Sequence, residues 1–184
     1  MTRSTPPPIT DELRAAARNR PNGWVYPTDP MFAPGEATPG YAVIGAWRVD
    51  GSGEITGEFQ PNPDYRPSPV ALGLPPAGNH LETMFQLVAT GYADEQPMLA
   101  ALADASPLAF VDGITPITRV ADGATVVPVY TSPGYLPASP DTAMPISVRD
   151  VLNEHPDYEI EINPGSPLTA RIPGEEILNA QPAT

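Results

Sequence analysis

Proline is the residue that most limits how this chain can fold. The sequence has 27 prolines among its 184 residues, far above the usual share of about 5%. Each proline fixes its own φ angle and lacks an N–H donor, so it is disfavoured inside helices and central strands. Because the prolines are spread along the whole chain, they predict short helices and strands joined by many loops and extended connectors.

Composition narrows the class of protein further. The chain has no cysteine, which excludes disulfides, thiolate metal sites and cysteine catalysis. Nine basic residues, all of them arginine, stand against 22 acidic ones, and the net charge of −13 disfavours binding to nucleic acid or to anionic membranes. No apolar stretch approaches the roughly 20 residues of a membrane-spanning helix, so we expect no membrane insertion. The N-terminus lacks the apolar segment of a secretory signal, and we expect a cytoplasmic protein.

The first 75 residues predict two parts. Residues 1–20 have the composition of a flexible N-terminal arm, although Thr10 could cap a short helix that runs through Arg18. Residues 21–75 predict a small β-hairpin module that ends in a proline-rich linker. Its clearest signal is "YAVIGAWRVDGSGEITGEF", where two alternating runs flank a Gly-rich turn at residues 50–53.

Residues 76–184 predict an α/β domain, with α+β as the alternative. Helix caps are expected at Asn79 and Ser147, and an Asp-Gly turn at residues 122–123 predicts a second hairpin. The expected order from residue 79 is two helices, three strands, a helix, a strand and a last short helix. That order predicts a mixed β-sheet with flanking helices.

Residue chemistry alone points to no catalytic, cofactor or metal site. His155 lies at a predicted helix end, where a cation is favourable, and His80, beside Asn79, is a single histidine expected to face solvent. The "DGSGE" turn lacks the spacing of a calcium loop. Glu159 and Glu161 fit the outer face of a strand. The loop "NPGSP" at residues 163–167 predicts a turn, because a phosphate cradle needs a Gly-rich loop that opens into a helix.

Two motifs of the C-terminal region resemble a known family. "VVPVYTSPGYL" at residues 126–136 and "INPGSPLTARIPGEEI" at residues 162–177 resemble the N-terminal domain of the SseB family, over about residues 79–180. Upstream, "PNGWVYPTDPMF", "VIGAWRVDGSGEITGEF" and "PNPDYRPSP" resemble actinobacterial proteins associated with type VII secretion systems. The resemblance implies a cytoplasmic accessory or adaptor protein, and it implies no enzymatic reaction.

We therefore expect a non-enzymatic protein, without a cofactor, that binds a protein partner such as a secretion component or substrate. A small-molecule or peptide sensor is the alternative, and an enzyme using His80 is the third hypothesis. Exposed aromatic residues and proline-rich loops are the candidate partner surfaces, although Trp24 and Trp47 could instead belong to the core. The candidate partner-binding residues are Trp24, Tyr26, Trp47, Tyr130, Tyr135, Asn163 and Ser166.

Overall fold

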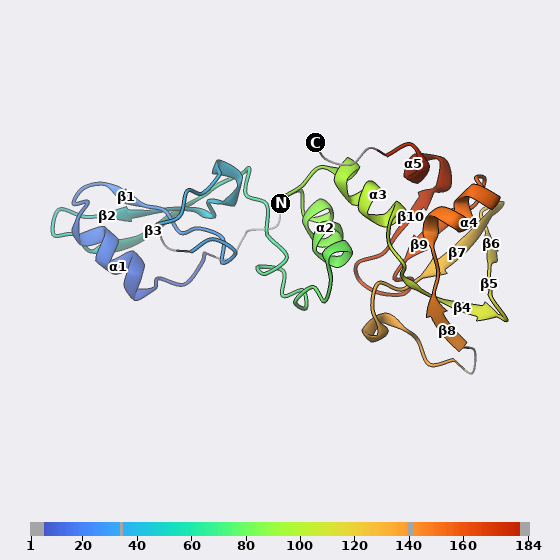
Figure 1. Cartoon of the computed structure of the whole chain (residues 1–184). Helices are drawn as coiled ribbons and strands as arrows, with labels where there is room; N and C mark the ends of the chain where they lie inside the picture. The colour runs from blue at the N-terminus through green and yellow to red at the C-terminus, as the bar shows by residue number, and fades with distance from the viewer. Residues whose placement is uncertain (1–5, 34, 140–141, 181–184) are drawn as a thin grey trace. The chain divides into compact units, whose positions relative to one another are not determined.

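The chain folds into two compact units, Met1–Pro75 and Pro76–Thr184, both of which are visible in Figure 1. The computed structural model describes residues 6–33, 35–139 and 142–180. The division falls where the sequence predicts the start of the α/β domain. Among the described residues, no helix is long and apolar enough to cross a bilayer.

The N-terminal unit contains a three-stranded antiparallel sheet. Its order is β1 (Trp24–Val25), β2 (Gly45–Val49) and β3 (Ile55–Pro61). The predicted hairpin between β2 and β3 is present. Asp50 holds its turn, because one carboxylate oxygen accepts the backbone N–H groups of residues 52 and 54 at 2.8 and 2.9 Å.

The core of this unit forms around Trp47. The Trp47 ring packs against Phe59 with a centroid separation of 4.7 Å, and Val25, Val49 and Ala17 are buried in the same cluster. Gly45 makes this packing possible, because a Cβ atom there would lie 2.5 Å from the carbonyl oxygen of residue 60 and would clash with the Phe59 ring.

The structure differs from the expected flexible arm over its described residues. Thr10 caps α1 (Asp11–Arg18) by accepting the N–H of Leu13 at 3.3 Å, as predicted. Ala17 of this helix is fully buried in the Trp47 cluster, and Ile9 and Leu13 pack against it. This apolar contact accounts for the difference, since it fixes the helix on the hairpin. Residues 1–5 of the predicted arm lie outside the described residues.

A buried carboxylate organises the proline-rich loops of the N-terminal unit. Asp29 is fully buried and accepts hydrogen bonds from the backbone N–H of Met31 and Ser68, both at 2.9 Å, and from the Tyr65 hydroxyl at 2.8 Å. Burial raises the pKa of Asp29, but the hydrogen bonds from these groups outweigh it, so the pKa lies below its ordinary value. Asp29 thereby joins the loop around Met31 to the loop around Ser68, two segments that are not paired as strands.

The larger sheet of the C-terminal unit has four strands. Its order is β10 (Ala170–Pro173), β9 (Glu159–Ile162), β7 (Ala124–Val129) and β6 (Arg119–Ala121). β7 and β9 are parallel, and the outer pairs are antiparallel. Pro128 lies in β7 beyond the last residue paired with β6, so its missing N–H interrupts no bond of that hairpin.

A second sheet continues from the end of β7. β4 (Leu108–Asp112) pairs with β5 (Thr115–Pro116) on one side and β8 (Thr142–Pro145) on the other, always antiparallel. Leu108 and Tyr130 exchange backbone hydrogen bonds of 2.9 and 2.7 Å, which join the two sheets. β8 is not expected from the sequence, because four residues ending in proline carry little strand signal.

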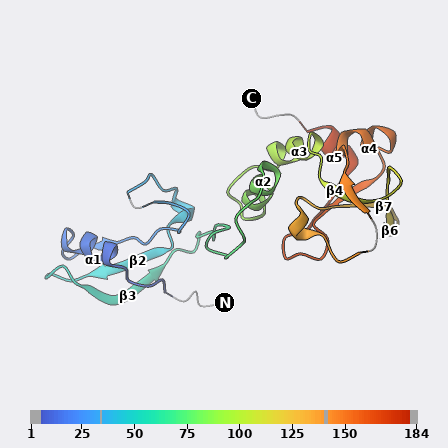
Figure 2. The ribbon, with the colours of Figure 1, turned by 60° about the horizontal axis from the view of Figure 1, so that its bottom comes forward.

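The helices of the C-terminal unit are α2 (His80–Ala89), α3 (Glu95–Ala103), α4 (Val148–Glu154) and α5 (Gly174–Leu178). Figures 1 and 2 show α3, α4 and α5 together beside the four-stranded sheet. The predicted caps are present, since Asn79 accepts from the third residue of α2 and Ser147 from the third residue of α4. Two short 3-10 turns, η1 (Gly40–Ala42) and η2 (Pro133–Tyr135), complete the elements.

One face of the four-stranded sheet forms the main core. Alternate residues of the parallel strands point to this face and are fully buried, and they pack with helix residues in one apolar cluster. The strand members are Val127, Val129, Ile160 and Ile162, and the helix members include Leu99, Leu102, Leu152 and Ile177. The predicted mixed α/β fold is therefore confirmed.

Replacement of Gly45 by alanine should destabilise the N-terminal unit by about 1–3 kcal/mol, because the new methyl group overpacks the site beside Phe59. Both tryptophans of the chain, Trp24 and Trp47, lie in this unit. Urea denaturation followed by tryptophan fluorescence therefore reports this unit alone.

Gly40→Ala is the matched control, since a Cβ atom there meets no described atom within 4 Å apart from its chain neighbours. An unchanged urea midpoint for Gly45→Ala would show that the Trp47–Phe59 packing tolerates the methyl group.

Candidate functional site

A buried polar junction lies at the carboxyl ends of the parallel strands. Thr131 follows β7 and Asn163 follows β9, so the parallel arrangement brings the two residues together. The Thr131 N–H donates to Asn163 Oδ1 at 2.9 Å, and Asn163 Nδ2 donates to the Thr131 hydroxyl oxygen at 3.0 Å. The Thr131 hydroxyl in turn donates to Glu82 Oε1 at 2.7 Å. These three buried side chains tie α2 to both strands.

The Glu82 carboxylate also closes the first turn of α2. Glu82 Oε2 accepts the Gly78 N–H at 2.6 Å, and the Glu82 backbone N–H donates to Asn79 Oδ1 at 2.9 Å. Asn79 Nδ2 donates to the Thr131 carbonyl at 2.8 Å. Burial raises the pKa of Glu82, but hydrogen bonds from the Gly78 N–H and the Ser132 and Thr131 hydroxyls together lower it by more. The pKa of Glu82 therefore lies below its ordinary value. The carboxylate is therefore held in its charged form.

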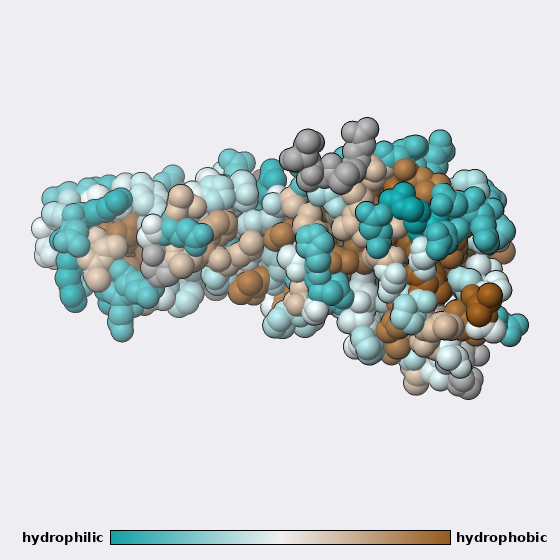
Figure 3. Space-filling view, viewed as in Figure 1, coloured by the Kyte–Doolittle hydropathy of each residue, from teal (hydrophilic) through white to brown (hydrophobic). Residues whose placement is uncertain are grey.

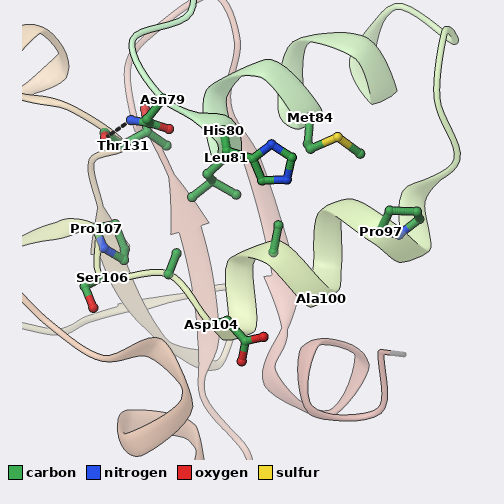
Figure 4. Close-up of a pocket in the computed structure, with 12 residues that line it drawn as sticks. Asn79, His80, Leu81, Met84, Pro97, Ala100, Asp104, Ser106, Pro107 and Thr131 are labelled. Carbon is green, nitrogen blue, oxygen red and sulfur yellow. Dashed lines mark hydrogen bonds between the residues drawn. The ribbon is translucent and has the colours of Figure 1, made fainter. Parts of the chain in front are cut away.

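A groove of about 760 Å³ opens beside this junction, between α2 and α3. We call it the α2–α3 groove, and Figure 4 shows its lining, with His80 beside Leu81 and Met84 on α2 and Ala100 on α3. Most of the lining is apolar, and its polar members are Asn79, His80, Asp104, Ser106 and Thr131. The full lining is Asn79, His80, Leu81, Met84, Pro97, Ala100, Ala101, Asp104, Ala105, Ser106, Pro107 and Thr131.

The α2–α3 groove contains a histidine, a carboxylate and a hydroxyl, the residue types of an acid–base site, but in the described structure they are not hydrogen-bonded to one another. Asp104 is paired with Arg149, whose Nη2 lies 2.6 Å from Oδ1. Within the described residues, no hydrogen bond joins His80 to Asp104 or to Ser106. An activated hydroxyl needs such a hydrogen-bonded base.

A second groove, of about 520 Å³, runs along α4. We call it the α4 groove. Asp150 and Glu154 lie four residues apart on one face of α4 and line one wall. His155 and Tyr158 also line the groove, and their rings are stacked with their centroids 4.4 Å apart. The remaining lining residues are Ile114, Thr115, Pro116, Thr118, Val127, Met144, Pro145, Ile146, Ser147 and Val151.

Two of the exposed large apolar side chains of the C-terminal unit line the α4 groove. Four large ones are exposed in the described part of the unit, namely Ile114, Ile117, Val120 and Met144. Ile114 and Met144 line the groove itself, and Ile114 is 89% exposed. Figure 3 shows brown surface in the region where Figure 1 labels β5. A turn residue with this exposure makes no contribution to the core.

Three of the predicted partner-binding residues are buried. Trp47 is 6% exposed, Tyr130 is 5% exposed and Asn163 is 1% exposed. Tyr130 packs edge-on against Phe110 with centroids 5.7 Å apart, and burial raises its pKa. Because core packing and the polar junction already use these side chains, they present little surface to a partner.

The other predicted residues are more accessible and are divided between the two units. Tyr26 is 51% exposed, and the half-buried Trp24 ring lies 5.2 Å below the Arg48 guanidinium. Tyr135 and Ser166 are half-buried in the other unit. The Ser166 hydroxyl donates to the carbonyl of residue 168 at 2.6 Å, which holds a local turn.

The loop at residues 163–167 is a turn, as its composition predicts. Asn163 and Gly165 have φ values of 47° and 80°, which are left-handed conformations that Asn and Gly adopt most readily. Ser166 N–H donates to the Asn163 carbonyl at 3.1 Å. The side chain of Asn163 is occupied by Thr131, so this loop serves the polar junction.

The two grooves and their exposed apolar residues were not identified from the sequence. Ile114 follows an Asp-Gly turn, and a large apolar residue at a hairpin tip is the one signal that could have pointed to it. In the described part of the chain, no group of three or more His, Asp or Glu side chains is placed to hold a metal ion.

The polar junction predicts how stability depends on pH. Glu82→Gln should lower the free energy of unfolding by about 1–3 kcal/mol near neutral pH, because a buried charged acceptor is lost. The folded-state pKa is depressed, so the stabilisation is present above the unfolded pKa of about 4.3 and is lost as pH falls through the lower folded value. Denaturation followed by circular dichroism should show the deficit shrinking below about pH 4.

Glu95→Gln is the matched control, since Glu95 is exposed at the start of α3. A deficit for Glu82→Gln that is equally large at pH 3 and pH 7 would contradict the charged form of the junction.

No protein-family model matches the chain, and no curated protein or solved structure gives a significant match to it. Its function therefore has to be inferred from its own grooves, charges and exposed side chains.

Proposed function

We propose that this chain is a non-enzymatic accessory protein that binds a protein partner through the α4 groove of its C-terminal unit. The observation that carries the proposal is the pair Ile114 and Met144, two exposed apolar side chains that line one groove. Burying one such side chain in a complex is worth about 1.5–3 kcal/mol. A groove with exposed apolar walls and a charged rim has the anatomy of a protein-binding site.

The resemblance to SseB-like and type VII secretion-associated proteins adds the class of partner. On that proposal the partner is a component or substrate of a secretion machine, and the complex forms in the cytoplasm. Further support comes from the N-terminal unit, where Tyr26, Met31, Val70 and Leu72 are exposed and offer additional contact area.

A small-molecule or peptide sensor is the second candidate function. The α2–α3 groove supports it, because its volume of about 760 Å³ falls within the ~300–1,000 Å³ of ligand-sized clefts. It also lies next to the carboxyl ends of parallel strands, where α/β proteins commonly bind ligands. A small apolar compound that raises the melting temperature of the protein, but not that of Ala101→Leu, would favour this function.

The partner-binding proposal predicts a site-specific loss of capture. The double variant Ile114→Thr, Met144→Thr should lose the proteins that the wild-type chain retains from a lysate of its native host, as identified by mass spectrometry. The physical reason is the loss of apolar surface at two exposed positions, which leaves the core intact. Circular dichroism should confirm an unchanged fold.

Val70→Thr, Leu72→Thr is the matched control, because these side chains are each 56% exposed but belong to the N-terminal unit. If the groove variant retains the same proteins as the wild type, the α4 groove is not the partner site.

A further inference from the structure

We propose that the α4 groove takes a cationic and apolar peptide segment, in which leucine-like side chains are interspersed with arginine or lysine. This inference rests on the proposed partner-binding function and adds the chemistry of the partner. The charge of the groove and of the unit around it carries this inference, since the shape of a groove alone does not identify the chemistry of its partner.

The charge of the C-terminal unit is strongly one-sided. Residues 76–184 contain three arginines and fourteen acidic residues, so they carry a net charge of −11 out of the −13 of the chain. All three arginines are already paired. Arg119 pairs with Glu161, Arg149 with Asp104, and Arg171 with both Asp122 and Glu159. Every arginine in the described part of this unit is therefore already used, which leaves little positive charge to attract an anionic partner.

The carboxylates of the α4 groove lack such partners. Asp150 and Glu154 make no ion pair within the described part of the unit, and both are exposed. Their separation of four residues on a helix places their side chains about 6 Å apart along one wall. That spacing matches alternate side chains of an extended peptide, which repeat every ~6.6 Å.

The apolar part of the groove complements the other face of such a peptide. Ile114, Met144 and Val151 line it together with the carboxylates. An extended segment that alternates apolar and basic residues presents the two kinds to opposite faces. When such a segment runs between the walls of the groove, its apolar side chains contact Ile114 and Met144 while its basic side chains face Asp150 and Glu154 on α4.

Other occupants fit the charge less well. A second copy of the chain carries the same net charge, and its C-terminal unit would add −11 on the other side of the interface. A nucleic acid or an anionic membrane is repelled in the same way. A polyamine would satisfy the carboxylates but would leave Ile114 and Met144 exposed.

The test is a titration of the full chain with a fluorescein-labelled octapeptide in which leucine alternates with arginine. The peptide should bind the wild type at low ionic strength. Asp150→Asn, Glu154→Gln should weaken binding roughly tenfold and reduce its salt dependence. The control variant Asp94→Asn, Glu95→Gln removes the same two charges at an exposed site on α3, away from the groove, and should bind as the wild type does.

Two further peptides test separately the contributions of the apolar and the cationic side chains. A serine–arginine octapeptide and a leucine–glutamate octapeptide should both bind at least tenfold more weakly than the leucine–arginine peptide. If the serine–arginine peptide binds equally well, or if both double variants weaken binding equally, the attraction is a general effect of net charge and the proposal is overturned.

The outcomes also separate this inference from the proposed function. If lysate capture depends on Ile114 and Met144 but not on Asp150 and Glu154, the groove binds a partner of different chemistry. If capture does not depend on Ile114 and Met144, the proposed function fails, whatever the peptides do.

Discussion

The C-terminal unit depends on one buried carboxylate. Glu82 accepts the Thr131 hydroxyl at 2.7 Å and the Gly78 N–H at 2.6 Å, so it fixes the start of α2 to the end of β7. Thr131 and Asn163 then fix β7 to β9. Because α2 packs on α3, and α3 contacts α4 and α5, this junction also sets the position of the helices over the sheet. Removing one member would leave the others buried without partners, which is why such networks are costly to break.

Carboxylate oxygens also accept backbone N–H groups in the N-terminal unit. In the N-terminal unit, Asp29 accepts the N–H groups of Met31 and Ser68, and it thereby joins two segments that lie 39 residues apart in the sequence. Asp50 does the same within the hairpin turn. A chain with 27 prolines has many loops without a strand partner. Side-chain oxygens then accept the backbone N–H groups that no strand pairing satisfies. The acidic composition therefore has a structural use in addition to its effect on the surface.

Local signals in the sequence predicted local structure well. Thr10, Asn79 and Ser147 mark three helix starts, because a cap is a contact between residues three positions apart. The turns at residues 50–53 and 122–123 are likewise short-range. Burial depends instead on residues distant in the sequence, so the sequence suggests Tyr130 and Asn163 as partner-binding residues although the structure buries them, and for Trp47 it leaves the core and the surface both open. Neither groove could be predicted, since each brings together segments that only the tertiary fold places side by side.

The distribution of ion pairs distinguishes the two grooves. In the α2–α3 groove, the carboxylate of Asp104 is matched by Arg149, so the lining presents little net charge to a ligand. In the α4 groove, Asp150 and Glu154 form no ion pair in the described structure. Exposed charges of one sign add little affinity each, but together they steer an oppositely charged partner to the site and discriminate against others. In the proposed complex, the apolar residues beside them supply the binding energy that a purely electrostatic surface lacks.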